Sequence, residues 1–490
     1  MRHVLLLVCA AGFALGTPCE KLTALTIPNV AIKSATLTPA SKDLPASCRV
    51  VAIATPTADS VIHFEVWIPA AEAWNGKFEG VGNNGFQGAI AYDAMAAALR
   101  RGYATAGTDT GHTGGDLKFG DGHPEKIADW AYRAIHLMTQ TAELIIRDHT
   151  GRFPQYSYFD GCNTGGHQAL MEAQRYPEDY DGIIAGDPAA DRVHEVVGYL
   201  WAWTATHKEG TSLLSPAKLQ FVTKATVAAC DALDGVKDGV IEDPRRCHFD
   251  PSALACRAGQ TENCLAPPEI AALKKVYGGA RNPRTGELIF PGWSPGSEGF
   301  GATSNEGWSN FINIPEPRRV DFLRYFVFNN PTWDWNSMDW DRDVAFADGK
   351  LGFIDATARD LTEFRARRGK LLMYTGWDDP ILPPLDITGY YESVARTMGG
   401  MAKTSDFFRL FMVPGMGHCS GGPGTTNFDM LPSLDQWVEK KVPPARVVAS
   451  RSTERTRPLC PYPSVAQWKG AGSTDDAANF TCAAPGGTKK

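Results

Sequence analysis

The chain has 490 residues, of which 43% are hydrophobic and 10% aromatic, so it can bury a large core and a disordered chain is excluded. Its formal net charge is -7 and it contains no long basic run, which argues against nucleic acid as a partner.

The N-terminus resembles a secretory signal peptide over residues 1–16. The letters "MRH" precede an apolar stretch from Val4 to Leu15, which overlaps the small-residue pattern "ALG". This stretch is too short to span a bilayer, and no later segment has about 18 uninterrupted apolar residues. We therefore expect the mature chain to have no membrane span and to be secreted or periplasmic.

The cysteine count favours an oxidising compartment. Removal of the signal peptide takes Cys9 with it and leaves ten of the 11 cysteines, an even number that favours disulfide bonds. No C-x-x-C pair is present to indicate otherwise. The alternative, ten buried free cysteines in a cytosolic protein, is disfavoured by the signal peptide.

The first predicted elements are strands, followed by a helix. Residues 50–70 alternate β-branched and polar positions around a turn, which predicts a β-hairpin. The stretch "GKFEGVGNNGFQG" then predicts a strand that runs into a glycine loop. From Glu125 to Arg147 apolar residues recur at helical spacing, which predicts a helix.

A strand-helix-strand unit follows. It consists of a strand at 156–160, a turn at 161–166, a helix to about Tyr176 and a strand at 183–185. This alternation implies a parallel sheet with helices on both faces.

After Pro188 the pattern gives way to turn-rich sequence until about Gly369, where "KLLMYTGW" and "FRLFMVPGMG" predict two more buried strands. The simplest organisation is a sheet domain of residues 17–190 and 368–490, interrupted by an inserted domain at 191–367. This insert holds seven of the 13 tryptophans, which suits planar apolar ligands, but ordinary core packing explains them at least as well.

Three loops that follow predicted strands carry groups suited to acyl transfer. The turn in "YFDGCNTGGHQAL" has the outline of a nucleophile elbow, G-x-S-x-G, with Asn163 in the place of serine. The loop "GWDDPILPP" offers Asp378 or Asp379, and "PGMGHCSGG" offers His418. Reactive groups lie beyond the carboxyl ends of strands in open α/β sheets, and the order elbow, acid, histidine is that of the α/β-hydrolases.

These residues resemble a known family. The run "YSYFDGCNTGGHQALMEAQRYPEDYDGIIAGDPA" is similar to the tannase and feruloyl esterase family, which includes the mono(hydroxyethyl) terephthalate hydrolases. The similarity extends to "FEVWIPAAEAWNGKFEGVGNNGF", "TDTGH", "CDALDGVKDGVIEDPRRC" and "GMGHCSGG", over nearly the whole mature chain. It implies an α/β-hydrolase fold with a large inserted lid domain. It also implies hydrolysis of feruloyl, galloyl or terephthalate half-esters without an organic cofactor.

The resemblance also implies roles for single residues. By family position Asp379 is the triad acid, His418 the base and Asn163 the nucleophile position. Asp378 is the alternative acid, because the family usually places a single aspartate directly before the proline. The implied oxyanion donors are the backbone N–H groups of Gly85 and Thr164.

Five disulfide bonds are implied by the same family positions. A bond between the elbow cysteine and the cysteine after the histidine would tie two catalytic loops together. The implied pairs are Cys162 with Cys419, Cys19 with Cys48, Cys230 with Cys247, Cys256 with Cys264, and Cys460 with Cys482.

The segment "CDALDGVKDGVIED" is rich in oxygen ligands that suit Ca²⁺, although its spacing differs from that of an EF-hand. On spacing alone, a solvated acidic turn closed by two cysteines is an equally good interpretation. Resemblance to the calcium loop of the family favours a structural ion in the insert. The expected ligands are the carboxylates of Asp231, Asp234 and Asp238 and the backbone carbonyls of Val236 and Val240.

Four further polar residues lie near these motifs in the sequence, and we assign none of them to the catalytic site. His112 in "TDTGHTGGD" could approach the site, but we expect it to hold its own turn together. Arg192, His194 and Glu195 follow the strand after the elbow and have no assigned role.

Asn163 limits what the site can do. A carboxamide cannot give a proton to His418, because its nitrogen lone pair is delocalised and its N–H is a very weak acid. Loss of a triad nucleophile costs about 10⁶ in turnover, on the order of 8 kcal/mol. We therefore expect the chain to bind its ester and hardly cleave it.

Three interpretations of Asn163 remain open. The chain is an esterase with an inactivating replacement, a catalytically silent binding protein, or a protein whose Asn163 deamidates to an aspartate nucleophile. We favour the first, because the other catalytic groups and the cysteine pair are all present. The third is the weakest, because Asn-Thr deamidates slowly and an elbow is rigid.

Overall fold

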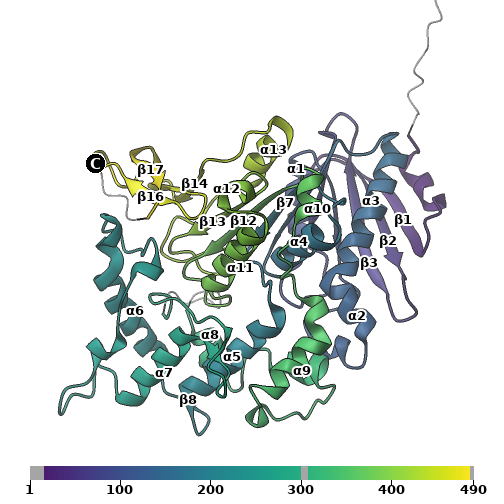
Figure 1. The fold of residues 1–490 in the computed structure, drawn as a ribbon. Coiled ribbons are helices and arrows are strands. Elements are labelled where there is room, and N and C mark those ends of the chain that lie inside the picture. Colours follow the sequence, from purple (N-terminus) through teal and green to yellow (C-terminus); the bar gives the residue numbers. More distant parts are fainter. Residues whose placement is uncertain (1–15, 300–306, 486–490) are drawn as a thin grey trace, which may run out of the picture.

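A nine-stranded sheet forms the centre of the computed structural model, which describes residues 16–299 and 307–485 (Figure 1). Nearly all of the predicted signal peptide lies outside the described residues. In sheet order the strands are β1 (Val30–Thr38), β2 (Ser47–Ala54), β3 (Ile62–Pro69), β5 (Ala104–Thr108), β4 (Lys77–Val81), β6 (Tyr156–Cys162), β7 (Gly182–Gly186), β12 (Lys370–Gly376) and β13 (Phe408–Val413).

The sheet is mixed. The first four strands in sheet order pair antiparallel, and the strands from β5 to β13 pair parallel. The predicted hairpin is β2 and β3, and the prediction of a parallel sheet is correct for the strands that precede the catalytic loops. The carboxyl ends of these parallel strands therefore meet at one edge of the sheet.

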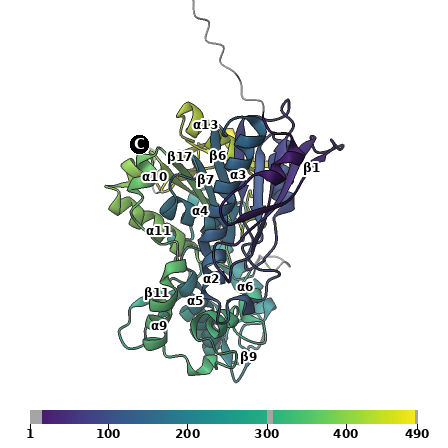
Figure 2. The ribbon, with the colours of Figure 1, turned by 90° about the vertical axis from the view of Figure 1, so that its right-hand side faces the viewer.

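Helices cover both faces of the sheet, as predicted (Figure 2). Side chains alternate along β7 and β12: Ile183 and Leu371 pack in one core, and Ile184 and Leu372 pack in the other. Strands buried on both faces read as continuous apolar runs. The first core contains α3 (Ala134–Thr150), α4 (Thr164–Arg175) and α11 (Pro384–Thr397); the second contains α1 (Tyr92–Arg100) and α13 (Leu431–Lys440).

The predicted helix over 125–147 consists of three pieces. These are α2 (Pro124–Ala128), a π-helical turn η3 (Asp129–Arg133) and α3, which ends at Gly151 with φ 80°. Within the turn, the buried Asp129 carboxylate accepts a 2.5 Å hydrogen bond from Arg133 Nε. The same turn places Trp130 against Phe86 of the glycine loop, with ring centroids 4.7 Å apart.

The described part of residues 191–367, which we call the lid segment, adds no strand to the nine-stranded sheet. Helices α5 to α9 lie at one end of the sheet in Figures 1 and 2, whereas α10 (Thr362–Ala366) lies beside the sheet, where Phe364 packs in the first core. The turn-rich pattern of this sequence did not predict the helices that the structure shows here. Helix α5 buries Val193, Val196, Val197 and Leu200 on several sides, so it lacks the polar stripe by which a surface helix is recognised. The helices are α5 (Arg192–Thr206), α6 (Pro216–Cys230), α7 (Pro267–Gly278), α8 (Ser309–Ile312), α9 (Arg342–Leu351) and α10 (Thr362–Ala366).

Four small antiparallel sheets lie outside the main sheet. The last two follow α13 and lie near α6 in Figure 1. These strands are β8 (His207–Lys208), β9 (Thr211–Ser212), β10 (Ala280–Arg281), β11 (Leu288–Phe290), β14 (Val447–Arg451), β15 (Arg455–Leu459), β16 (Val465–Trp468) and β17 (Phe480–Ala483); the short helix α12 spans Met401–Thr404.

Five disulfide bonds cross-link the chain with the pairing that the family resemblance implied. One of them, Cys162–Cys419, joins residues 257 positions apart in sequence. Such a set is typical of proteins that fold outside the reducing cytoplasm. Among the helices of the described residues, none has the length and apolar character needed to cross a membrane.

Removal of the Cys162–Cys419 bond should destabilise the protein more than removal of Cys256–Cys264, which closes a separation of only 8 residues. In the chain-entropy model the longer loop contributes about 3 kcal/mol more to the free energy of unfolding. Paired cysteine-to-alanine variants unfolded in denaturant measure the difference. Equal losses in the two variants would contradict the prediction.

Candidate active site

Three loops meet at the carboxyl edge of the parallel strands. Asn163 follows β6, Asp379 follows β12 and His418 follows β13. Asn163 Nδ2 lies 2.5 Å from His418 Nε2, and His418 Nδ1 lies 2.8 Å from Asp379 Oδ2. The structure thus brings together the three residues of the predicted triad, and all three are buried.

The elbow holds Asn163 in a strained conformation, with φ 62° and ψ -114°. Its backbone N–H donates to Gly186 O at 3.0 Å, and α4 begins at the next residue. The turn needs glycine at position 161, because an added Cβ would lie 2.6 Å from the Gly165 backbone. A strained strand-to-helix turn of this kind presents its central side chain above the sheet.

The bond to Asp379 fixes the state of the His418 ring. A carboxylate only accepts, so Nδ1 carries the proton and Nε2 of the neutral ring is an acceptor. The Asn163 amide donates to that nitrogen. Burial alone would lower the pKa of His418, but the attraction of Asp379, with smaller contributions from Asp187 and Glu195, raises the pKa above 6.5.

The structure distinguishes the two candidate acids. Asp379 contacts His418 through Oδ2, and its Oδ1 accepts from the backbone N–H groups of Ile381 and Leu382 at 2.7 and 2.9 Å. Asp378 makes no hydrogen bond to His418 among the described residues. Burial, with the nearby Glu298 carboxylate, raises the pKa of Asp378 well above its ordinary value.

A second carboxylate, Asp187, lies beside the triad and was not identified from the sequence. Its Oδ1 accepts from Thr375 Oγ1 at 2.7 Å and Gly376 N at 3.0 Å, and its Oδ2 accepts from Cys419 N at 2.9 Å. Burial and the Asp379 carboxylate raise the pKa of Asp187 to about 8, although the hydrogen bonds from Gly376 and Thr375 lower it. Asp187 therefore ties the end of β7 to both the end of β12, which precedes Asp379, and the histidine loop.

Two backbone N–H groups are free to bind a developing oxyanion. Neither Gly85 N nor Thr164 N donates to any acceptor in the part of the chain that the structure describes. Both belong to residues next to Asn163 in space, because Thr164 Oγ1 lies 2.6 Å from Gly85 O. These are the two predicted oxyanion donors.

The glycine loop is fixed from behind by His112. Its Nε2 lies 2.9 Å from Phe86 O, and its ring stacks on Phe119 with centroids 3.8 Å apart. His112 is buried and makes no contact with the triad among the described residues. These contacts agree with the expectation that His112 has a structural role and holds its turn together.

Arginines surround the same glycine loop. The guanidinium groups of Arg192 and Arg319 lie 5.4 and 4.9 Å from the Phe86 ring centroid. An added Cβ on Gly85 would lie 3.5 Å from Arg319 Nη2, so this cation sits beside the oxyanion donor. Burial and neighbouring Arg318 lower the pKa of Arg319 to about 10, which leaves it charged at pH 7. Arg319 also lines a cavity of about 710 Å³.

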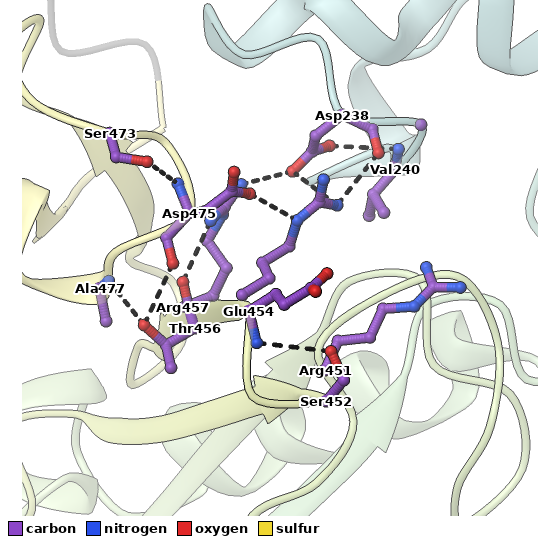
Figure 3. Close-up of polar contacts among 12 residues, drawn as sticks. Asp238, Val240, Arg451, Ser452, Glu454, Thr456, Arg457, Ser473, Asp475 and Ala477 are labelled. Atoms are coloured by element: carbon purple, nitrogen blue, oxygen red, sulfur yellow. Dashed lines mark hydrogen bonds and ion pairs between the residues drawn. The ribbon is translucent and has the colours of Figure 1, made fainter.

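The acidic loop lies far from the triad in sequence and faces the C-terminal strands. Figure 3 shows Asp238 beside Arg457 of β15, and Arg457 Nη2 donates to Asp238 Oδ2 at 2.6 Å. Asp231 Oδ1 accepts from Asp238 N at 3.0 Å, and Asp234 Oδ1 accepts from Val236 N at 2.9 Å. The loop is therefore closed by carboxylates that cap its own backbone.

The donor chemistry of this loop fits a hard cation. A cavity of about 20 Å³ is lined by Asp234, Asp238, Val240 and the half-buried Glu242. The loop supplies only oxygen ligands. One of them, Asp238 Oδ2, is paired with the Arg457 guanidinium at 2.6 Å. In the described part of the chain, however, Asp231, Asp234 and Asp238 do not form a cluster in which one carboxylate oxygen from each lies within 4.8 Å of the others.

Residues 48–483 match the family model for tannase and feruloyl esterase. The chain belongs to the tannase and feruloyl esterase family. An uncharacterized esterase of Xanthomonas campestris pv. campestris is 40% identical, over 98% of this chain and 95% of its own length. Mono(2-hydroxyethyl) terephthalate hydrolase of Piscinibacter sakaiensis is 34% identical, over 86% of this chain and 82% of its own length.

A solved relative has the same fold. The crystal structure of feruloyl esterase B from Aspergillus oryzae matches with a TM-score of 0.87 at 30% identity, over 95% of this chain and 99% of that chain. The family and these relatives indicate a carboxylic ester hydrolase with an α/β-hydrolase fold, as the resemblance predicted.

In an Asn163→Ser background, Asp379→Asn should reduce kcat by about 10⁴, because an amide in this position favours the wrong imidazole tautomer. Asp378→Asn should reduce kcat far less, because Asp378 does not contact the imidazole. Steady-state hydrolysis of a nitrophenyl ester measures both. Equal losses would show that the acid is wrongly assigned.

The same background variant should show an acid limb of kcat/KM above pH 6.5. Catalysis needs the neutral imidazole, and Asp379 raises the pKa of His418. Activity should therefore be lost as the pH falls through that raised value. A limb below pH 6 would contradict the prediction.

Proposed function

We propose that this chain has the site of an esterase for aromatic carboxylic acids, built for a Ser-His-Asp mechanism, in which Asn163 silences turnover. The observation that supports this most directly is the position of His418, hydrogen-bonded both to Asp379 and to residue 163. A serine oxygen at position 163 would be placed to lose its proton to His418 as it attacks the ester carbonyl.

The remaining machinery supports the same proposal. The free N–H groups of Gly85 and Thr164 would bind the oxyanion of the tetrahedral intermediate. His418 would then protonate the leaving alcohol. In this mechanism Asp379 holds the tautomer and stabilises the imidazolium.

The charge around the glycine loop favours an anionic acid part. Arg319 has no carboxylate partner among the described residues, whereas Arg192 pairs with Glu195 at 3.0 Å. A partly buried, unpaired guanidinium beside Gly85 is stabilised by a bound carboxylate. Of the three ester classes, feruloyl, galloyl and terephthalate half-ester, only the last carries a free carboxylate, so we propose that this class binds best.

We also propose that the protein is secreted or periplasmic. Residues 191–367 would act as a lid, and the acidic loop would hold a structural Ca²⁺. Five disulfide bonds and the signal-like N-terminus support export. If bound, Ca²⁺ would be held by the carboxylates of Asp231, Asp234 and Asp238 and the carbonyls of Val236 and Val240, where it would neutralise a partly buried acidic turn.

The alternative is a catalytically silent binding protein. The hydrogen bond from Asn163 Nδ2 to His418 favours this candidate, because it gives the acceptor nitrogen of the imidazole a donor that cannot attack an ester. Deamidation to an aspartate nucleophile is the weakest interpretation, since Thr164 begins α4 and the strained elbow holds its backbone in place.

Asn163→Ser should raise ester hydrolysis by about 10⁶-fold over the parent chain, because the change supplies the missing nucleophile to an otherwise complete site. Initial rates with a feruloyl ester, a terephthalate half-ester and the corresponding neutral diester measure activity and preference. The half-ester should give the lowest KM.

Asn163→Ala serves as the matched control, because it shortens the side chain without adding a nucleophile. It should be as inactive as the parent chain. If Asn163→Ser is also inert while the parent binds these esters tightly, the binding-protein alternative is correct and the esterase proposal is wrong.

Calcium at 100 times its Kd should raise the free energy of unfolding by about 2.7 kcal/mol. The double variant Asp234→Asn, Asp238→Asn should lose this gain, whereas Asp475→Asn should keep it. Asp475 belongs to the same cluster in Figure 3 but pairs with Arg455 outside the loop. Thermal or denaturant unfolding after chelation, with and without added Ca²⁺, is the measurement. No shift in the parent chain would exclude the ion.

A further inference from the structure

The first residue of the lid helix α5, Arg192, contacts the oxyanion site through hydrogen bonds. Its side chain is 3% exposed, and its Nη2 donates to Thr164 Oγ1 at 3.0 Å. Its Nη1 donates to the buried Glu195 carboxylate at 3.0 Å, one turn further along α5. Arg192 is therefore held by the lid segment and reaches the nucleophile elbow.

The direction of the hydrogen bonds follows from the chemistry of the groups. A guanidinium can only donate, so Thr164 Oγ1 must accept from Arg192. A hydroxyl has one proton, and Thr164 Oγ1 lies 2.6 Å from Gly85 O but 3.2 Å from Asn163 Oδ1. The proton of Thr164 therefore goes to the Gly85 carbonyl.

This chain of hydrogen bonds joins the two residues whose N–H groups are free. Gly85 lies on the loop after β4, with φ 56°, and Thr164 lies at the start of α4. Their separation and relative orientation are set by the bond between the Thr164 hydroxyl and the Gly85 carbonyl, together with the bond from Gly165 N–H to Asn83 O at 2.7 Å. Arg192 orients that hydroxyl, and its guanidinium also packs 5.4 Å from the Phe86 ring centroid next to Gly85.

The contacts of Arg192 are not those of a group that only stabilises the fold. Its Nε has no hydrogen-bond partner among the described residues although it is buried. Burial of a donor without a partner is unfavourable. The side chain thus keeps an unfavourable group in the core while it completes the link between Thr164 and Glu195.

The helix that carries Arg192 is itself anchored. Asp355 Oδ1 accepts from the backbone N–H groups of Arg192 and Val193 at 2.9 and 3.3 Å, at the positive N-terminus of α5. The Asp191 side chain accepts from His194 N at 3.2 Å and caps the same turn. The position of the guanidinium is therefore set by the lid segment.

We propose that Arg192 is a positioning residue that aligns the Gly85 and Thr164 N–H groups for the oxyanion through the Thr164 hydroxyl, and so couples the placement of the lid segment to transition-state stabilisation. This inference rests on the proposed esterase function. It concerns the alignment of the donors and is separate from the binding of the substrate's acid part by Arg319.

The first test needs no activity and uses the parent chain. Arg192→Met keeps a side chain of similar length beside the stacked Phe86 and Trp130 rings but removes both donors. Hydrogen exchange followed by mass spectrometry should show faster exchange in peptides over 82–88 and 160–167. The control, Arg324→Met, removes a lid arginine that pairs with Asp321 and Glu316, and should leave these peptides unchanged.

The second test is kinetic, in the Asn163→Ser background. Arg192→Met should lower kcat by about 10²-fold, the effect of a small misplacement in the site, with KM changed less than threefold. Thr164→Val should cause a similar loss, and the double variant should lose little more, because both changes break the same chain of hydrogen bonds. Thr164→Ser should retain most activity.

The outcomes separate the two proposals. If Asn163→Ser is inactive, the esterase proposal fails, and the exchange measurement still decides whether Arg192 orders the two loops. If exchange at 82–88 and 160–167 is unchanged, or if the losses from Arg192→Met and Thr164→Val add fully, the positioning role is wrong. Arg192→Lys, which retains the charge but lacks the fork, is the second variant if Arg192→Met folds poorly.

Discussion

The chemistry of this site depends on the position of one imidazole, and that position depends on contacts that bind three loops together. The Cys162–Cys419 bond joins the residues before the elbow position and after His418. Asp187 adds noncovalent ties from the end of β7 to Gly376 in the acid strand and to Cys419. Burying this carboxylate is unfavourable, which its raised pKa reflects, but its hydrogen bonds hold the backbone on both sides of the triad.

Asn163 is compatible with this frame for two physical reasons. Asparagine tolerates a positive φ better than most residues, so the strained elbow does not exclude it. Its amide N–H also donates to the same nitrogen of His418 that would accept a serine proton. The ground-state hydrogen bonds of a triad are therefore retained without a group that can attack. The site that we propose to be inert can stay fully ordered, because its order comes from the frame and not from the reaction.

The sequence predicted the elements whose signals are local. The buried strands, the glycine-rich elbow and the order of Asn163, acid and His418 were readable because each lies at the end of an apolar run. Helix α5 was missed because it is buried on several sides and shows no amphipathic stripe. Asp187 and Arg192 were missed for another reason: their importance comes from burial and from partners more than 25 positions away, such as Thr164 and Cys419, and no motif marks it.

The short segment between Asp187 and Arg192 explains how a large inserted segment can be present while the geometry of the active site is kept. Asp187 contacts the histidine loop, and Arg192, five positions later, contacts the elbow and begins α5. The chain therefore leaves the sheet and enters the lid segment through the active site itself. A displacement of α5 would move Arg192 relative to Thr164. We infer that the outer part of the lid segment is free to vary with the ligand, while the first turn of α5 is constrained by the chemistry.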